Sequence, residues 1–142
     1  KVNVRYYEGV QQIKEAFEDQ LDAMKNTEGL SLAGSLEEVY ACISETYWAE
    51  WDARFAKQNS FYRILAHNTE AGQRTAASDK QYKRETRWIK DFPLRVNIEV
   101  FNDVVLIVSF GDEIAIWIES KILADSQRMV FNSLWSLSKP FN

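Results

Sequence analysis

Histidine is a common catalytic base and cysteine a strong catalytic nucleophile, and this sequence contains one of each. His67 follows a predicted strand at 61–66, at the edge where open α/β sheets commonly bind ligands. Cys42 falls within a predicted helix, away from any predicted loop, so no Cys–His pair is expected. We interpret Cys42 as a small, buried or half-buried thiol. We interpret His67 as a surface or capping side chain beside Asn68, with ligand contact as the alternative.

Charged side chains form two patterns that bear on ion binding. Arg84 and Arg87 are spaced to clamp an anion, but Glu85 between them favours local ion pairs on a solvated surface. One predicted helix carries four carboxylates, Glu15, Glu18, Asp19 and Asp22. A hard cation needs oxygens that converge, and these spread along a helix face, so we expect that face to be solvated. No His/Cys spacing suits zinc and no glycine-rich phosphate loop is present, so the sequence predicts no metal and no cofactor.

Aromatic residues are abundant, with five Trp and eight Phe, and they can fill either a core or an interface. Trp51 and Phe55 follow the apolar stripe of a predicted helix at 36–57, and we expect both in the core. Trp48 lies off that stripe, and Trp88 lies near the end of another predicted helix. Trp48 and Trp88 are therefore the candidates for contact with a partner.

Length and composition fit one globular domain of 142 residues. The net charge is −4 and basic residues are interleaved with acidic ones, which disfavours duplex binding by this chain alone. A single cysteine excludes an internal disulfide and favours a reducing compartment, so we expect a cytoplasmic protein. No apolar run is long enough to span a bilayer, so no membrane contact is expected.

Hydrophobic periodicity predicts ten elements in the order β-α-β-α-β-α-β-β-β-α. The predicted strands cover 2–6, 30–33, 61–66, 94–100, 104–108 and 114–118, and the predicted helices cover 10–24, 36–57, 69–89 and 120–135. Ser35 and Glu38 form a capping box, while Asn102–Asp103 and Gly111–Asp112 are predicted turns. Alternating strands and helices favour parallel pairing, and the late run of adjacent strands adds an antiparallel part. The sequence therefore predicts a single α/β domain with a mixed, mostly parallel sheet flanked by helices.

Several segments together resemble the C-terminal effector domain of TrmB-type transcriptional regulators. Two of these segments lie near the start, VRYYEGV at 4–10 and IKEAFEDQL at 13–21. The other four lie towards the end: RETRWI at 84–89, the run 96–109, IWIES at 116–120 and FNSLW at 131–135. The likeness covers nearly all 142 residues in matching order.

That family is known chiefly from archaea and some bacteria. Its members join an N-terminal winged helix-turn-helix, a helical dimerisation segment and an effector domain similar in fold to one half of a phospholipase D-like enzyme. The resemblance implies a homodimer whose DNA-binding part lies before Lys1, with DNA contacted only through that part. Because relatives sense sugars, it also implies a sugar as the effector.

Phospholipase D-like enzymes use a His-x-Lys-x4-Asp motif, in which the histidine attacks phosphorus and the lysine stabilises phosphoryl charge. Laid onto the predicted hairpin, the motif places Asn97 at the histidine and Glu99 at the lysine, with Asp103 near the acidic position. An amide cannot form the phosphoenzyme, and a carboxylate repels the phosphate that a lysine would hold. We therefore expect no phosphodiester hydrolysis by this route and predict that the chain is not an enzyme.

The resulting hypothesis is an effector-sensing and dimerisation domain that binds a small molecule at the strand-end edge. The residues expected to line its pocket are Tyr7, Glu8, His67, Asn68, Asn97 and Glu99. The alternative is a catalytically inactive phospholipase D-like module for protein interaction or scaffolding. A hydrolase that uses other residues is a third, less favoured hypothesis.

Overall fold

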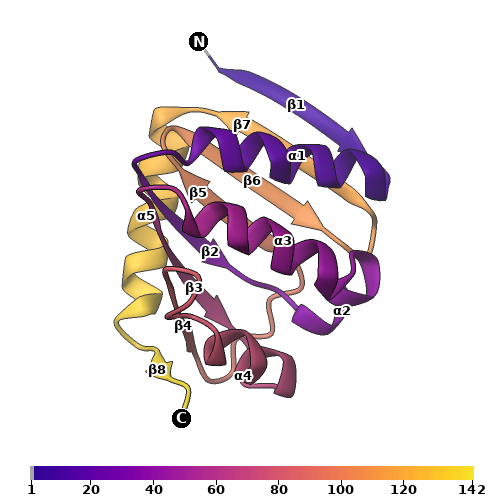
Figure 1. Ribbon diagram of the computed structural model, residues 1–142. Coiled ribbons are helices and arrows are strands. Elements are labelled where there is room, and N and C mark those ends of the chain that lie inside the picture. Colours follow the sequence, from indigo (N-terminus) through magenta and orange to yellow (C-terminus); the bar gives the residue numbers. More distant parts are fainter. Residues whose placement is uncertain (1) are drawn as a thin grey trace.

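Eight strands form one mixed sheet that carries helices on both faces (Figure 1). The structure, a computed structural model, describes residues 2–142. The strands are β1 (Asn3–Glu8), β2 (Glu28–Leu32), β3 (Phe61–Ala66), β4 (Arg84–Trp88), β5 (Asn97–Phe101), β6 (Val104–Ser109), β7 (Ile114–Glu119) and β8 (Lys139–Pro140). The helices are α1 (Val10–Ala23), α2 (Leu36–Cys42), α3 (Glu45–Ala56), α4 (Glu70–Ala77) and α5 (Lys121–Trp135). The predicted single α/β domain is confirmed.

The strand order across the sheet is β1-β7-β6-β5-β2-β3-β4-β8. Only the pairs β2–β3 and β3–β4 are parallel, and the other five neighbouring pairs are antiparallel. The sheet is therefore mixed, as predicted, but it is mostly antiparallel and not mostly parallel. The reason is that β1 lies at the edge beside β7, while β5 takes the place next to β2.

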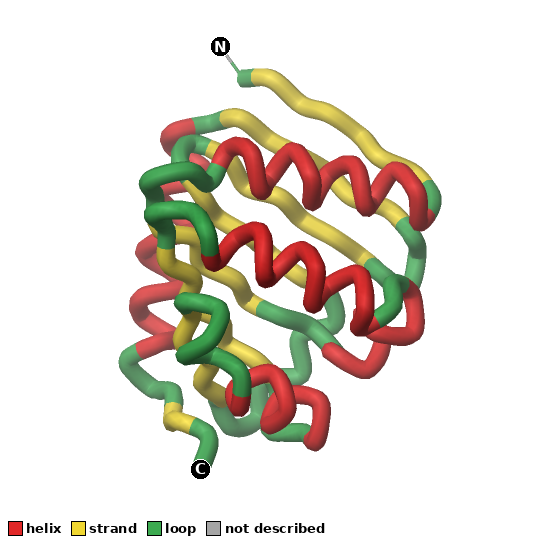
Figure 2. The backbone as a smooth tube through the Cα atoms, viewed as in Figure 1, coloured by secondary structure: helices red, strands yellow, loops and turns green. Residues whose placement is uncertain are grey.

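Helices α1 to α4 cover one face of the sheet, and α5 alone lies on the other (Figures 1 and 2). The larger core packs beneath α1 and α3, where Ile13, Phe17 and Phe55 are buried. A smaller core centred on Phe131 packs beneath α5. Because both faces of the middle strands are covered, β5 is not the half-buried strand that its alternation indicated. Its polar residues point into the larger core.

The predicted helix at 36–57 is interrupted. Ile43 adopts extended backbone angles (φ −130°, ψ 127°), and the hydroxyl of Ser44 accepts the backbone N–H of Tyr47, which starts α3 as a separate helix. Cys42 therefore ends α2 rather than lying within a long helix. The predicted N-cap is confirmed, because the Ser35 hydroxyl accepts the Glu38 N–H. In the predicted capping box the Glu38 carboxylate would turn back to the start of the helix. In the structure it lies 3.5 Å from Arg95 instead.

The predicted helix at 69–89 is wrong in its second half. Helix α4 ends at Ala77, Lys83 has a positive φ of 57°, and Arg84–Trp88 forms β4 beside β3. A carboxylate holds this change of direction, since Asp79 accepts the backbone N–H of Thr86 at 2.6 Å and its hydroxyl at 2.9 Å. Pairing with β3 thus overrides the weak helical pattern of the segment.

The C-terminal third follows the sequence prediction, except that the strand expected at 94–100 begins at Asn97 and that Lys139–Pro140 adds the unpredicted β8. A two-residue turn with Asn102 at φ 51° joins β5 to β6, and a turn through Gly111–Asp112 leads into β7. The hydroxyl of Ser120 accepts the Leu123 N–H and caps α5. The part of the chain that the structure describes contains no helix long and apolar enough to cross a membrane.

Candidate functional site

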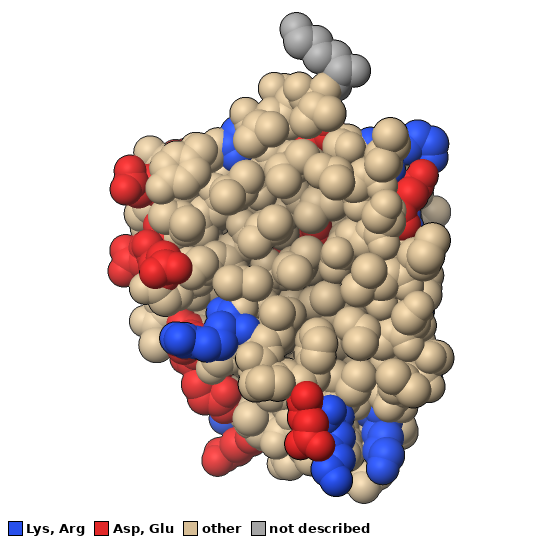
Figure 3. Space-filling view, turned by 180° about the vertical axis from the view of Figure 1, so that it is seen from behind, with Lys and Arg blue, Asp and Glu red and all other residues tan. Residues whose placement is uncertain are grey.

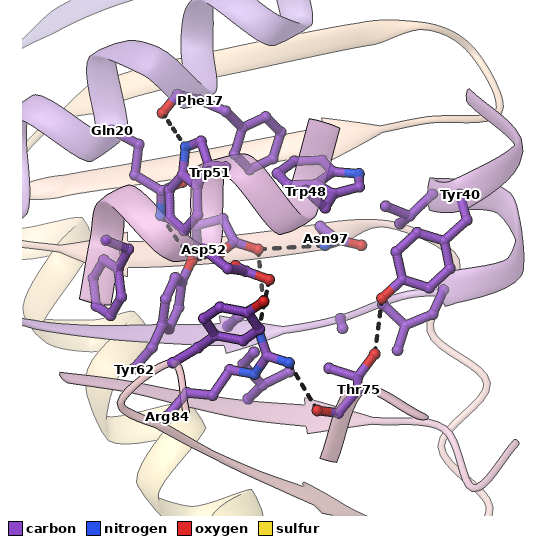
Figure 4. A pocket seen from close by; sticks show the side chains of 18 of the residues that line it. Phe17, Gln20, Tyr40, Trp48, Trp51, Asp52, Tyr62, Thr75, Arg84 and Asn97 are labelled. Carbon is purple, nitrogen blue, oxygen red and sulfur yellow. Dashed lines mark hydrogen bonds and ion pairs between the residues drawn. The ribbon is translucent and has the colours of Figure 1, made fainter. Parts of the chain in front are cut away.

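A partly enclosed cavity of about 90 Å³ lies between the sheet and the helices α1 to α4 (Figure 4). The sheet contributes its polar side chains, Ser31, Tyr62, Arg84, Asn97 and Glu99. The helices contribute mainly apolar and aromatic side chains, including Phe17, Leu36, Val39, Trp48 and Trp51. Apolar walls with a few buried polar groups are typical of small-molecule sites.

Asn97 and Glu99 of β5 are fixed in the floor of this cavity by hydrogen bonds. One Glu99 oxygen accepts the Ser31 hydroxyl at 2.7 Å, and the other accepts the Tyr62 hydroxyl. The Asn97 side-chain oxygen accepts the Gly34 N–H at 2.9 Å, and its amide nitrogen lies 3.4 Å from Glu99. Both residues are buried. The floor is therefore a network of hydrogen bonds among Ser31, Tyr62, Asn97, Glu99 and the Gly34 N–H.

Burial raises the pKa of the Glu99 carboxyl above its ordinary value, and hydrogen bonds from Tyr62, Ser31 and Asn97 offset only part of that effect. Burial also raises the pKa of the Tyr62 hydroxyl, and the adjacent Glu99 raises it further. Tyr62 therefore remains the donor in their hydrogen bond. Both pKa values are therefore higher in the folded protein than the ordinary values of these groups.

Substitution of Glu99 by glutamine is expected to flatten the dependence of stability on pH. Because the folded-state pKa of Glu99 is raised, the folded protein binds the proton more tightly than the unfolded chain does. The free energy of unfolding therefore falls as pH rises from the ordinary carboxyl pKa of 4.5 to the raised one. Urea unfolding of both proteins across this range checks the prediction, and parallel profiles would contradict it.

Arg84 of β4 occupies a second polar corner of the cavity. Its guanidinium lies 2.8 Å from Asp52 of α3 and 2.8 Å from Asp79, and it donates to the Thr75 carbonyl oxygen at 2.7 Å. The Arg84 side chain is only 7% exposed. Although burial lowers the pKa of Arg84, the two carboxylates outweigh that effect and raise it. Arg84 is therefore charged, and its contacts with Asp52 and Thr75 connect β4 to α3 and α4.

The aromatic wall contains two unsatisfied polar atoms. The Trp51 indole N–H donates to the Phe17 carbonyl oxygen at 2.9 Å, and Trp48 packs edge-on against the Phe17 ring at 4.8 Å. By contrast, Nε1 of Trp48 and Oε1 of Gln20 are buried and have no hydrogen-bond partner among the described residues. A buried donor and acceptor left unsatisfied next to a cavity are available to a ligand or to water.

The residues predicted to line one pocket occupy three separate places. Asn97 and Glu99 lie together in the cavity. Tyr7 and Glu8 end β1, where the Tyr7 hydroxyl donates to Asp19 at 3.3 Å. His67 and Asn68 line a broad, open hollow after β3, and the structure does not bring them near Glu99.

That open hollow also contains one of the two predicted interface residues, Trp88. Trp88 is half-buried, and the Lys139 ammonium lies 5.6 Å from its ring. The other predicted interface residue, Trp48, is half-buried in the cavity wall and packs against Phe17 and Trp51.

The site also contains Asp52, Tyr62 and Gln20, which no sequence pattern singles out. It contains Arg84 as well, for which the sequence predicts local ion pairs on a solvated surface, whereas its side chain is buried. Arg84 was assigned to a helix face, so its approach to α3 could not be foreseen. Alternation from Arg84 to Trp88, with β-forming Thr86 and Trp88, was the available signal for a strand. The other three are spread over α1, α3 and β3, and only the packed fold brings them together.

The fold is that of phospholipase D-like proteins. NucT from Helicobacter pylori superposes with a TM-score of 0.72 at 9% identity, over 99% of this chain and 100% of that one. Nuc from Salmonella typhimurium, a phospholipase D family member, superposes with a TM-score of 0.68 at 14% identity, over 100% and 99%. No protein-family model and no curated protein matches the chain in sequence.

The same fold occurs in TrmBL2, an archaeal chromatin protein described as binding DNA in a novel mode. TrmBL2 superposes with a TM-score of 0.69 at 15% identity, over 96% of this chain. The chain spans about half of TrmBL2, since 52% of that protein is covered. The predicted TrmB-like, phospholipase D-like fold is therefore confirmed, while identities this low leave function to the site itself.

Proposed function

We propose that this chain is a non-catalytic module that senses a small-molecule effector in the cavity beneath α2 and α3. The observation that carries the proposal is the burial and hydrogen bonding of Asn97 and Glu99. They occupy the positions expected for the catalytic histidine and lysine, yet they are buried and engaged in hydrogen bonds within the cavity floor. The only histidine, His67, is followed by Asn68 and Thr69, so no His-x-Lys pair occurs in the sequence.

The lining favours an uncharged ligand that carries hydroxyl groups. The unsatisfied Trp48 N–H can donate to such a group and the Gln20 carbonyl can accept from it. Aromatic faces suit the apolar side of a sugar-like ring. The buried Glu99 disfavours an anion, and Arg84 is already occupied by two carboxylates. A sugar, the expected effector class, is compatible with these features.

Helix α2 is the element best placed to report the ligand. Leu36, Val39 and Tyr40 of α2 line the cavity, and the helix is only seven residues long with the break at Ile43 behind it. A cavity of about 90 Å³ holds several water molecules but is smaller than a whole sugar ring requires. A ligand would therefore bind a state with α2 displaced and shift the population towards it.

The output would be DNA binding by another part of a longer protein. TrmBL2, which shares the fold and is described as a DNA-binding chromatin protein, supports this context. In this proposal the effector domain works as a homodimer in the cytoplasm. It passes the displacement of α2 to a winged-helix module that precedes residue 1.

A second candidate function is a protein-interaction or scaffolding module without a ligand. The observation that favours it is a row of exposed apolar side chains on β1 and α5, well away from the cavity. The two functions differ in whether the cavity is used.

A thermal-shift screen with sugars, nucleotides and phosphates separates the two candidates. A ligand at 100 times its Kd is expected to stabilise the protein by about 2.7 kcal/mol. Val39→Phe and Ala33→Met, which fill the cavity from two sides, should each abolish that shift while the variants remain folded. No shift with any compound, or equal shifts in the filled variants, would favour the scaffold.

A further inference from the structure

An apolar surface extends over β1, β7 and the outer side of α5, away from the cavity. Seven of its residues are 46–79% exposed, namely Val2, Val4, Tyr6, Ile122, Leu123, Met129 and Val130. Figure 3 shows this side of the molecule, where charged side chains gather at the margins and the middle is almost free of them. We call these seven residues and the β7 isoleucines between them the β1–α5 surface.

The strand part of this surface is continuous across neighbouring strands. Val4 pairs with Ile118 and Tyr6 pairs with Ile116, so the four side chains share one face of the sheet. The isoleucines are half-buried, because α5 crosses the sheet over β2, β5 and β6 and leaves β7 partly open.

The helix part adjoins the strand part. Asn132 accepts a hydrogen bond from Arg63 of β3, so that flank of α5 faces β3, on the opposite side from β7. At 100° per residue, Val130 lies about 200° around the helix from Asn132. Asp125 precedes Asn132 by about two turns and lies on the same flank, and Leu123 lies about 200° from Asp125. Leu123 and Val130 therefore face β7 and β1, and Ile122 and Met129 extend the surface outwards.

The outer edge of β1 also carries free backbone groups. The Gly9 N–H donates to the Glu113 carbonyl oxygen beside β7, so by alternation the N–H groups of Val4 and Tyr6 point away from the sheet. The Glu8 N–H shares that direction and is satisfied by the Gln12 side chain at 2.8 Å. No described strand pairs with the edge at Val4 and Tyr6. Open strand edges are templates for pairing with another chain.

The size of the surface fits a partner. Its exposed apolar area is on the order of 800 Å², which is what each partner contributes to a standard interface. Apolar patches on monomers are usually about 300–600 Å². Charges beside β1 occur in both signs, since Arg5 lies 3.3 Å from Asp19 and 3.9 Å from Glu119. A margin of mixed sign can face a copy of itself without net repulsion.

We propose that the β1–α5 surface binds a second copy of this chain. The two β1 strands pair antiparallel across a two-fold axis, so that the two sheets join into one, and the apolar faces of α5 pack beside the seam. A two-fold axis suits a strand edge because an antiparallel pair of identical strands is self-complementary. This proposal names the contact surface of the dimeric module proposed above, and it does not depend on the cavity being occupied.

The double substitution Val4→Lys with Tyr6→Lys tests the seam. Both side chains are 58% exposed, so the variant should fold, but it would place like charges opposite one another in the paired strands. We expect wild-type protein to sediment as a dimer and the double variant as a monomer, with the dimer Kd raised roughly 100-fold or more. Val4→Pro, which removes an outward N–H without touching α5, should weaken the dimer as well.

The matched control is Leu137→Lys, which charges a residue that is 69% exposed beyond the end of α5 and outside the surface. It should leave the dimer intact, and urea unfolding should show that all variants are folded. A wild-type monomer at every accessible concentration, or a dimer that survives the double substitution, would overturn the proposal. If no compound in the screen binds but the wild-type protein is a dimer, the proposed sensing function is contradicted and the proposed dimer surface is not.

Discussion

Arg84→Met is expected to lower the free energy of unfolding by about 3–5 kcal/mol, because it removes one partner from a buried ion network. Asp52 and Asp79 are only 21% and 17% exposed, and without the guanidinium both carboxylates lose their counter-charge. The Thr75 carbonyl oxygen loses its donor at the same time. The loss should appear as a lower urea midpoint with an unchanged slope.

Arg74→Met is the matched control for this substitution. Arg74 of α4 also contacts two carboxylates, Glu45 at 3.3 Å and Glu70 at 3.7 Å, but its side chain is 50% exposed. Exposed ion pairs contribute about 0–1 kcal/mol, so Arg74→Met should change stability little. Similar losses for both variants would show that the Arg84 corner does not join β4 to the helices.

Trp51→Ala is the second substitution with a large expected effect, about 3–5 kcal/mol. The Trp51 side chain is 3% exposed, it stacks on Phe55 at 5.7 Å, and its N–H satisfies the Phe17 carbonyl oxygen. Truncation would remove the contacts of the ring and merge the vacated space with the cavity. Differential scanning calorimetry would measure the loss as a lower Tm.

Trp51→Phe separates packing from hydrogen bonding in this prediction. The phenyl ring keeps the stack on Phe55 and loses only the donor to Phe17, so we expect a loss of about 1–2 kcal/mol. A loss as large as that of the alanine variant would assign the role of Trp51 to the hydrogen bond rather than to the aromatic wall.

Local signals in the sequence were sufficient where an element depends on its own residues. The β5–β6 hairpin, the turn into β7 and the start of α5 depend on Asn102, Gly111–Asp112 and Ser120, and each is confirmed. The positions of Asn97 and Glu99 on β5 followed from the same hairpin.

Elements decided by distant contacts were not predictable in this way. The apolar stripe runs through Ile43, so nothing in the periodicity marks the break before Ser44. The strand at Arg84–Trp88 depends on pairing with β3 and on the turn held by Asp79. Likewise, β1 reaches the sheet edge only because β7 returns beside it.

The same limit applies to the site. Glu99 and its partners Ser31 and Tyr62 are 68 and 37 residues apart in the chain. Arg84 meets Asp52 across 32 residues. Residue type alone marks such side chains as exposed, and only the packing of α1 and α3 against the sheet shows that they enclose a cavity.

Calorimetric titration of the best compound from the screen tests the central claim most directly. The predicted result is one site per chain, with at least a tenfold loss of affinity in Val39→Phe and unchanged affinity in the Leu137→Lys protein. Undiminished binding by the cavity-filled variant would contradict the account. So would hydrolysis of a phosphodiester by the wild-type protein that disappears on substitution of Asn97 or Glu99.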